Sequence, residues 1–230
     1  MGSIQATIGK HKSHFLKIGY GIQCHFTAMM LPMSRRLLQL YAGLILYGAS
    51  MGLQIRAGLG LDPWDVFHQG ISEKTGLSFG TIVIITGALV LLAWIPLRQK
   101  PGIGTVSNVF VIGFAVDATL ALMPDVDMLG AQLSLLATSV VLNAIAGAAY
   151  IGAGLGPGPR DGLMTGLVRR TGGRVGRIRT GIELSVLAVG FACGGTVGLG
   201  TVVYALSIGP LLHVMLPPLT LREPAVLTAA

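Results

Sequence analysis

Two stretches of the sequence hold glycine, proline and aspartate in nearly the same order, and each predicts a helix that begins after a chain break. Residues 58–65 read GLGLDPWD, and residues 154–161 read GLGPGPRD. Glycine interrupts a helix, whereas proline is favoured in the first helical turn. A helix N-terminus presents unpaired backbone N–H groups and the positive end of the helix dipole, so it attracts anions. We therefore expect short helices at 63–72 and 159–168 that line a solute path from opposite faces, or that lie flat on the two membrane surfaces.

The candidate site residues lie in these stretches and in two apolar segments. The helix-breaking glycines are Gly58, Gly60, Gly154 and Gly156, and the path or coupling residues are Asp62, Pro63, Trp64, Asp65, Pro159, Arg160, Asp161, Asp117 and His213. Asp62 has the side chain of a good N-cap. Arg160 is the best direct contact for an anion, because its guanidinium group binds a carboxylate or phosphate through two hydrogen bonds. Trp64 occupies the corresponding position of the first stretch.

The titratable and polar candidates allow functional and structural interpretations. Asp65 and Asp161 either cap the first turn of a helix or form a pair that couples transport to a proton or cation. Asp117 and His213 lie at corresponding positions of two apolar segments, where they would serve a proton relay or pair with other helices. Glu183 has Arg179 one turn before it and is expected to form a local ion pair. His68 is expected at a wet interface, and Asn108 and Asn143 are expected to hydrogen-bond between helices.

The two stretches belong to an internal repeat with an offset of 96 residues and no gaps. The match extends to Gly70 and Gly166, Gly80 and Gly176, Gly102 and Gly198, and Gly113 and Gly209, and to Thr-Gly at 75–76 and 171–172 and Gly-Thr-Val at 104–106 and 200–202. Gly48 and Gly52 fall on Ala144 and Ala148, so a spacing of small residues that favours close helix packing also repeats.

The composition explains what kind of protein this repeat builds. Of 230 residues, 52% are hydrophobic and 11% charged, and the mean hydropathy is +0.74. A soluble domain carries about 25% charged residues, so the chain is expected to be an integral membrane protein and not a nucleic-acid-binding domain. Six apolar segments are long enough to cross a bilayer: 37–56, 77–96, 105–123, 129–151, 178–194 and 201–216. Three spans per repeat make the second repeat inverted relative to the first, which is the architecture of many transporters.

The basic residues predict the orientation. With a cytoplasmic N-terminus, 14 of the 16 Lys and Arg residues lie on the cytoplasmic side, and Arg56 and Lys74 lie outside. Retained positive charge marks cytoplasmic loops, so both termini are expected in the cytoplasm. The cluster from Arg169 to Arg179 is explained largely in this way, although it would also suit anionic lipid or a protein partner.

The remaining expectations concern domains and chemistry. Residues 1–32 are expected to be a disordered or non-native extension with translation starting at Met33, followed by repeats at 33–128 and 129–217 and a cytoplasmic tail at 218–230. Cys24 and Cys193 have no redox or metal-ligand spacing, and the common hydrolase and nucleotide motifs are absent. We expect no enzyme activity, no cofactor or metal, and no nucleic-acid partner; membrane lipids and a small solute are the expected partners.

The motifs at 58–65 and 156–161 resemble those of the bacterial YczE/YitT-type integral membrane proteins, particularly the YczE branch. The resemblance covers about residues 35–216 and leaves out the first 32 residues. It implies a cytoplasmic-membrane protein without an established biochemical activity, sometimes assumed to be a permease. The sequence thus favours a permease or channel-like carrier for a small solute, with an anion as one candidate. The alternative is a scaffold or accessory subunit that does not transport.

Overall fold

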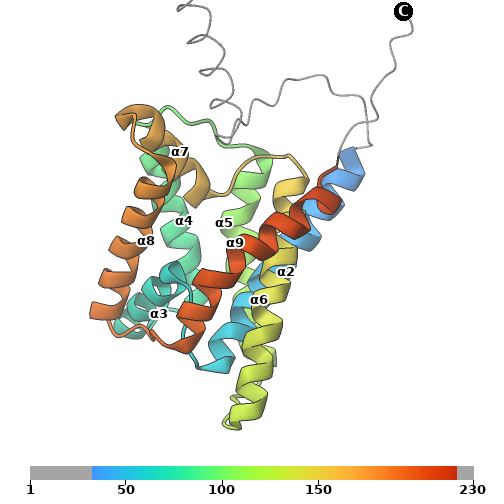
Figure 1. The fold of residues 1–230 in the computed structure, drawn as a ribbon, viewed down its shortest axis with the longest axis vertical. Coiled ribbons are helices and arrows are strands. Elements are labelled where there is room, and N and C mark those ends of the chain that lie inside the picture. The colour runs from blue at the N-terminus through green and yellow to red at the C-terminus, as the bar shows by residue number, and fades with distance from the viewer. Residues whose placement is uncertain (1–32, 222–230) are drawn as a thin grey trace, which may run out of the picture. The chain divides into compact units, whose positions relative to one another are not determined.

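The computed structural model describes residues 33–221, and this part of the chain folds into helices without a strand. The helices are α2 (Met33–Ala57), α3 (Pro63–Thr75), α4 (Phe79–Trp94), α5 (Ile103–Leu122), α6 (Leu129–Gly152), α7 (Pro159–Thr171), α8 (Val175–Ala192) and α9 (Leu199–Leu219) (Figure 1). The predicted extension at 1–32 and residues 222–230 of the predicted tail lie outside the described range.

The helix boundaries repeat with the same offset as the sequence. The short helix α3 covers residues 63–75, and α7 covers residues 159–171, so both of its ends are shifted by 96. The starts of α2, α4 and α5 precede the starts of α6, α8 and α9 by 96 residues as well. The predicted short helices are therefore confirmed, and each extends three residues beyond its predicted end.

Local chemistry explains where the short helices begin and end. The Asp62 carboxylate accepts hydrogen bonds from the backbone N–H groups of Trp64 (2.8 Å) and Asp65 (2.9 Å), which confirms the predicted N-cap. Helix α7 begins after Gly158 without a side-chain cap. The breaks before the two helices need glycine, because Gly60 and Gly156 have φ angles of 113° and 129°.

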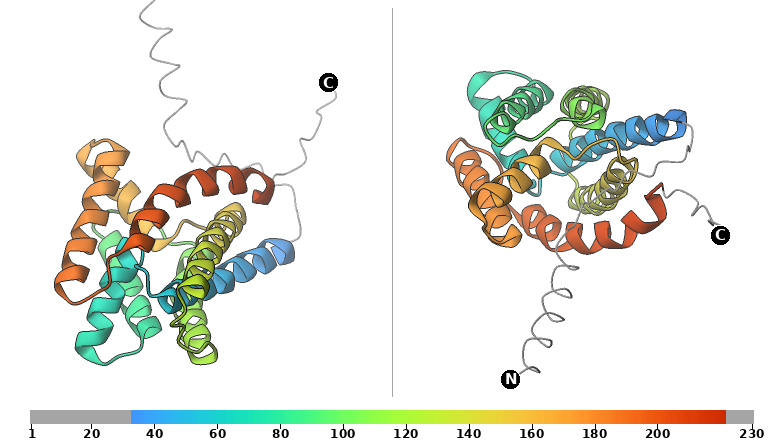
Figure 2. Two further views of the ribbon diagram at one scale, coloured as in Figure 1. Left: turned by 60° about the horizontal axis from the view of Figure 1, so that its bottom comes forward. Right: turned by 90° about the horizontal axis from the view of Figure 1, so that it is seen from above.

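Helices α2, α5, α6 and α9 pack together (Figures 1 and 2). Helices α2 and α6 run in opposite directions, and Gln39 near the start of α2 donates to the carbonyl of Ala149 near the end of α6. Gly48 and Gly52 face α5, where a Cβ atom would come within 2.6 Å of Ala115 and 2.7 Å of Thr119. The predicted spacing of small residues therefore serves close packing between helices.

The other four helices pack crosswise between the repeats. Helix α3 lies against α8, and α7 lies against α4. Trp94 of α4 donates its indole N–H to the carbonyl of Pro159 (3.0 Å), and Gly162 leaves room for the Trp94 ring. At the position that corresponds to Trp94, Gly190 of α8 lies against the backbone of Val66 and Phe67. Each repeat thus holds the short helix of the other.

Two equivalent backbone hydrogen bonds also join the two repeats. Gly104 at the start of α5 donates to Leu155 in the second break (2.9 Å), and Gly200 at the start of α9 donates to Leu59 in the first break (2.7 Å). Donors and acceptors both differ by 96 residues. The two breaks are therefore fixed by the opposite repeat in the same way.

Several of the helices are suited to a bilayer. Four meet the length and hydropathy expected of a span, namely α2, α5, α6 and α9, and α3 with α4 makes a fifth if this pair, bent by 116°, is counted as one. Helix α4 alone has 16 residues, and α8 carries Arg177, Arg179 and Glu183, so the predicted count of six exceeds what length and composition support. Large apolar side chains are exposed on the helices, including Leu38, Phe114, Leu122 and Leu206 at 66–83%. Such exposure suits contact with lipid.

Candidate functional site

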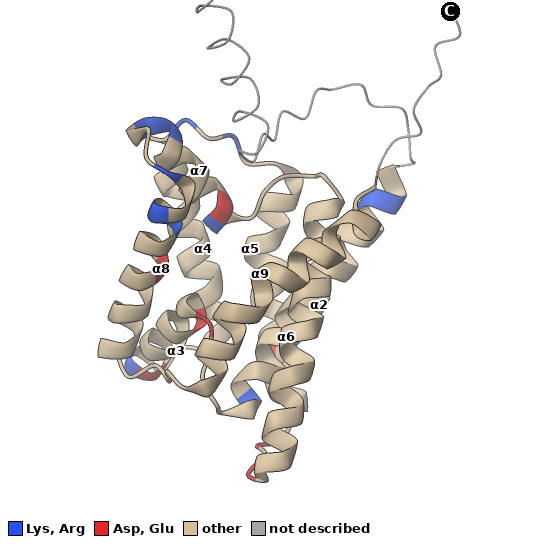
Figure 3. Cartoon of the chain, in the orientation of Figure 1, with Lys and Arg blue, Asp and Glu red and all other residues tan. Residues whose placement is uncertain are grey.

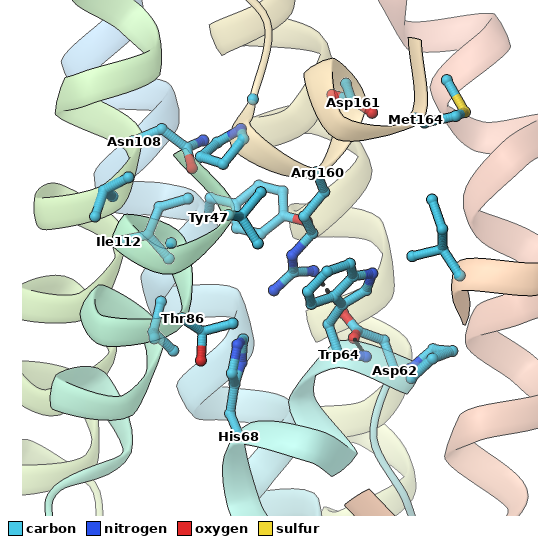
Figure 4. A pocket seen from close by; sticks show the side chains of 18 of the residues that line it. Tyr47, Asp62, Trp64, His68, Thr86, Asn108, Ile112, Arg160, Asp161 and Met164 are labelled. Atoms are coloured by element: carbon cyan, nitrogen blue, oxygen red, sulfur yellow. Dashed lines mark hydrogen bonds and ion pairs between the residues drawn. The ribbon is translucent and has the colours of Figure 1, made fainter. Parts of the chain in front are cut away.

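A cavity of about 170 Å³ lies where the two broken-helix stretches meet. Asp62, Pro63 and Trp64 line it from the start of α3, and Pro159 and Arg160 line it from the start of α7 (Figure 4). Stretches almost 100 residues apart in the sequence thus contribute their helix N-termini to one site. The predicted path residues Asp62, Pro63, Trp64, Pro159, Arg160 and Asp161 are all in its lining.

The lining follows the repeat. Sixteen of the 22 lining residues form pairs that differ by 96 in number: Asp62 and Gly158, Pro63 and Pro159, Trp64 and Arg160, His68 and Met164, Val83 and Arg179, Thr86 and Ile182, Gly87 and Glu183, and Asn108 and Tyr204. Equivalent faces of both repeats therefore enclose the cavity.

Trp64 and Arg160 show where the repeats meet, because these equivalent residues touch each other. The Arg160 guanidinium carbon lies 4.8 Å from the centre of the Trp64 ring. This distance allows a cation–π interaction. Trp64 is buried, whereas the Arg160 side chain is 31% exposed and extends from α7 toward α3 (Figure 4).

Two carboxylates of the first repeat face Arg160. Its guanidinium nitrogens lie 3.9 Å from Asp62 Oδ2 and 3.7 Å from Asp65 Oδ1. These distances give charge attraction but are too long for good hydrogen bonds. Asp65 Oδ2 is buried and has no hydrogen-bond partner. The three groups thus hold opposite charges together while their hydrogen-bonding capacity is only partly used.

His68 lies beneath this cluster and not at a wet interface, so that expectation is wrong. It is 1% exposed, and its Nδ1 lies 3.2 Å from Asp65 Oδ1. Its ring packs edge-on against Phe79, with 5.8 Å between ring centres. The sequence did hold one signal of burial, because the equivalent position in the second repeat is the apolar Met164.

Burial changes the protonation of the acids at the two helix starts. It raises the pKa of Asp62 to about 6; the nearby Asp65 adds to this effect and Arg160 opposes it. Burial also raises the pKa of Asp161, while Arg179 and the hydroxyl of Tyr150, 3.3 Å from Asp161 Oδ2, oppose the change. Desolvation disfavours a charged carboxylate, so both acids hold a proton at a higher pH than an exposed aspartate.

Asp117 and His213 lie outside the cavity lining. Asp117 accepts hydrogen bonds from Ser78 Oγ (2.6 Å) and from the backbone N–H of Gly80 (2.7 Å), so it binds α5 to the start of α4. His213 lies exposed on α9. The two residues therefore occupy unlike surroundings despite their equivalent positions.

Other polar residues join helices around the site. Tyr204 donates to Asn143 Oδ1 and Asn143 donates to Ser50 Oγ, both at 2.9 Å, which confirms the predicted interhelical role of Asn143. Asn108 lines the cavity. The predicted pair of Arg179 and Glu183 is also confirmed, at 2.9 Å.

Three tyrosines contribute to the site without a signal in the sequence. Tyr47 and Tyr150 line the cavity, and their rings pack edge-on at 6.0 Å between centres; Tyr204 lines it from α9. Tyrosine inside an apolar helix has the composition of ordinary core, so only the fold reveals that the three reach one cavity. In residues 33–221, no group of three His, Cys, Asp or Glu side chains is placed to hold a metal ion.

Known proteins match nearly the same part of the chain as the structure describes. Residues 34–217 match a family of unknown function, DUF6198. An uncharacterized protein of Haemophilus influenzae is 35% identical over 173 residues, which are 75% of this chain and 79% of the relative. The uncharacterized membrane protein YczE of Bacillus subtilis is 35% identical over 180 residues, 77% of this chain and 83% of the relative. No solved structure matches.

Proposed function

The chain belongs to the family of unknown function DUF6198, and we propose that it is a carrier that moves a small anionic solute across the bacterial inner membrane. In this proposal six spans form two inverted repeats of three spans, and the short helices α3 and α7 enter between them. The repeated helix boundaries and the opposite directions of α2 and α6 support the arrangement. Transporters built from inverted repeats bind their substrates at the repeat interface.

The cavity shared by the two repeats is the observation that carries this proposal. Eight equivalent pairs line it, and the equivalent residues Trp64 and Arg160 touch inside it. A scaffold has no need of a polar cavity at its repeat interface, because a dry core would hold its helices together as well. Short helices lying flat on the membrane surfaces would likewise not converge on one site.

The chemistry at the start of α7 favours an anion. Gly158 provides no side-chain cap, so the first turn of α7 keeps donor capacity toward the cavity. Arg160 adds a charged group with two parallel donors, and its distances to Asp62 and Asp65 leave these donors for a solute. A carboxylate or phosphate fits both features.

The balance of charge suggests that a proton accompanies the anion. Asp62 and Asp65 already offset Arg160, so an anion beside Arg160 would leave three negative charges around one positive charge. Uptake of a proton by one aspartate removes this excess. A pKa of about 6 at Asp62 makes such uptake accessible slightly below neutral pH.

The distribution of basic residues supports the orientation. Lys and Arg gather at the end of the molecule that holds α7 and the start of α8, and few lie at the end that holds α3 (Figure 3). Positively charged ends face the cytoplasm, so we assign the α7 end and both chain termini to that side.

The test is uptake by the purified full chain in liposomes, with radiolabelled inorganic phosphate, lactate and succinate as probes and an inward proton gradient. We expect uptake of at least one probe, a loss of more than tenfold in Arg160→Gln, and a loss of proton dependence in Asp62→Asn or Asp65→Asn. Arg174→Gln is the matched control, because Arg174 is exposed and lies outside the cavity lining. Absence of uptake of all three probes by the wild-type chain would refute the anion carrier and favour the scaffold.

A further inference from the structure

Two pairs of equivalent glycines have opposite surroundings, although each pair lies at the same place in its repeat. Gly80 of α4 and Gly113 of α5 face each other so closely that a Cβ on Gly80 would come within 2.0 Å of the Gly113 carbonyl oxygen. The equivalent residues are Gly176 of α8 and Gly209 of α9. Both are exposed, and a Cβ on either would meet no other helix within 4 Å.

In the described conformation no other helix packs on Gly176 or Gly209. Glycine inside a helix is less favourable than alanine, because it loses more backbone freedom on folding. At Gly80 and Gly113 the close approach of two backbones offsets this cost. Gly176 carries the same cost without the contact.

From this difference, and resting on the proposed carrier function, we infer that Gly176 and Gly209 form a second gate: in the other conformation of the carrier, α8 closes on α9 through these glycines while α4 separates from α5. The two gates are then the same contact in the two repeats. In the described conformation the α4–α5 gate is closed and the α8–α9 gate is open.

The position of the cavity agrees with this assignment. It extends to Arg179, Ile182 and Glu183 of α8 and to Tyr204 of α9, so it reaches the space between the two helices that the second gate would close. Gly80 lies at the start of α4, near α3, whereas Gly176 lies at the start of α8, near α7 (Figure 1). The gates therefore lie toward opposite ends of the molecule. With the α7 end in the cytoplasm, the described conformation faces inward.

The two gates are not equally stable, because different residues surround them. Asp117 holds the first gate closed through Ser78 and Gly80. The residues equivalent to Ser78 and Asp117 are Arg174 and His213, which offer no carboxylate to the start of α8. The inward-facing conformation is accordingly the resting one, and the other forms during the transport cycle.

Disulfide cross-linking tests the gate without any solute. Ile84 is the side chain that packs on Gly113, and its equivalent is Thr180, which is exposed on α8. We expect Thr180→Cys with Gly209→Cys to cross-link under mild oxidation in liposomes, in a background with Cys24→Ala and Cys193→Ala. A disulfide needs Cα atoms within about 7 Å of each other, so the bond forms only if α8 reaches α9. Gly181→Cys with Gly209→Cys is the control, since residue 181 is rotated by about 100° around the helix.

Steric block of the gate is the second measurement. A Cβ at position 176 meets no other helix in the described conformation, so Gly176→Leu is expected to match or exceed the wild type in expression and melting temperature. Gly209 is kept in this variant, because Pro210 follows it within α9 and disfavours a helical residue with a Cβ at position 209. Uptake of the probe anions should nevertheless fall more than tenfold. Gly181→Leu on the same helix, also without a neighbour within 4 Å and equivalent to Ile85, should retain uptake.

The outcomes separate the gate from the carrier function. Cross-linking at 180 and 209 without uptake of any probe supports the gate and refutes the anion carrier. Uptake without this cross-link, or full uptake in the Gly176→Leu variant, overturns the gate and leaves the carrier standing. Cross-linking that abolishes uptake, reversed by reduction, supports both.

Discussion

The helices of the two repeats begin at equivalent residues, but the repeats differ in how their last two helices meet. In the first repeat, α4 lies against α5 through Gly80 and Gly113, and Asp117 binds the start of α4. In the second repeat the same glycines are present at 176 and 209, but no other helix packs on them. Identical residues at equivalent positions thus support two packings. The difference resides in the side chains around the glycines, and in particular in the exchange of Asp117 for His213.

The repeats also contribute different charges to the cavity. The first provides Asp62 and His68 to the lining, whereas the second provides Arg160, Asp161, Arg179 and Glu183. The backbone framework is therefore nearly symmetric, while the electrostatics is not. Symmetry suits a structure that alternates between two conformations, and asymmetry suits a site that binds one kind of solute.

The second repeat has Arg160 where the first has Trp64. Of the differences between the repeats, this one is expected to have the largest effect on stability. Arg160→Gln leaves Asp62 and Asp65 without their cation, and loss of one partner from a buried ion pair costs about 3–5 kcal/mol. Because Arg160 is 31% exposed, we expect the lower end of this range at pH 7, measured as the melting temperature in detergent. Arg174→Gln should change stability by less than about 0.5 kcal/mol.

A rescue experiment separates charge imbalance from lost packing against Trp64. Asp62→Asn and Asp65→Asn, combined with Arg160→Gln, remove the uncompensated charges and should restore most of the melting temperature. A triple variant as unstable as Arg160→Gln alone would show that packing, and not charge, explains the loss.

The paired glycines provide the next largest contrast. Gly80→Ala places a methyl group 2.0 Å from a backbone oxygen that cannot move aside easily, and overpacking of this kind costs about 1–3 kcal/mol. Gly176→Ala meets open space and should be neutral or stabilising by up to about 1 kcal/mol, because alanine favours the helix. Melting temperatures of both variants in the same detergent test this contrast. Equal shifts in one direction would contradict the difference between the two gates.

Asp117 and His213 should show a smaller contrast of the same kind. Asp117→Ala removes the acceptor of the Ser78 hydroxyl and the Gly80 N–H, and loss of such a cap costs about 0.5–2 kcal/mol. His213→Ala alters an exposed residue and should change stability by less than about 0.5 kcal/mol. In the cross-linking experiment Asp117→Ala should also increase the yield at 180 and 209, because it weakens the first gate. A decrease in yield would show that Asp117 does not favour the inward-facing conformation.

The sequence predicted local structure well because local structure depends on neighbours in the chain. Proline after aspartate and a glycine break specified the start of α3, and the repeat transferred the same boundary to α7. The spacing of four residues between Arg179 and Glu183 specified their pair. Each of these inferences needed no knowledge of what packs nearby.

Contacts between helices that lie far apart in the sequence could not be predicted in the same way. The crosswise packing of α3 on α8 depends on helices more than 100 residues apart, and a histidine such as His68 is equally common at wet surfaces and in partly paired interiors. The sequence holds glycine at all four positions of the proposed gates, so the glycines alone do not indicate which pair is in contact, and the contact of Asp117 with the start of α4 becomes visible only in the fold. That choice belongs to the conformation.

The start of each short helix offers the finest contrast, because Asp62 caps α3 and Gly158 stands in its place before α7. Burial raises the pKa of Asp62 from 3.8 to about 6, so the folded chain binds this proton more tightly than the unfolded chain does. The stabilisation is complete below about pH 4 and is lost as the pH rises through 6, with a slope of at most about 1.4 kcal/mol per pH unit. We expect the melting temperature to rise as the pH is lowered from 7 to 5, and Asp62→Asn to reduce this rise, since asparagine still caps the helix but does not titrate. Gly158→Asn is the matched control and should leave the pH dependence unchanged. A slope unaffected by Asp62→Asn would assign the titration to another group, and the proton proposed to accompany the anion would then have to reside there.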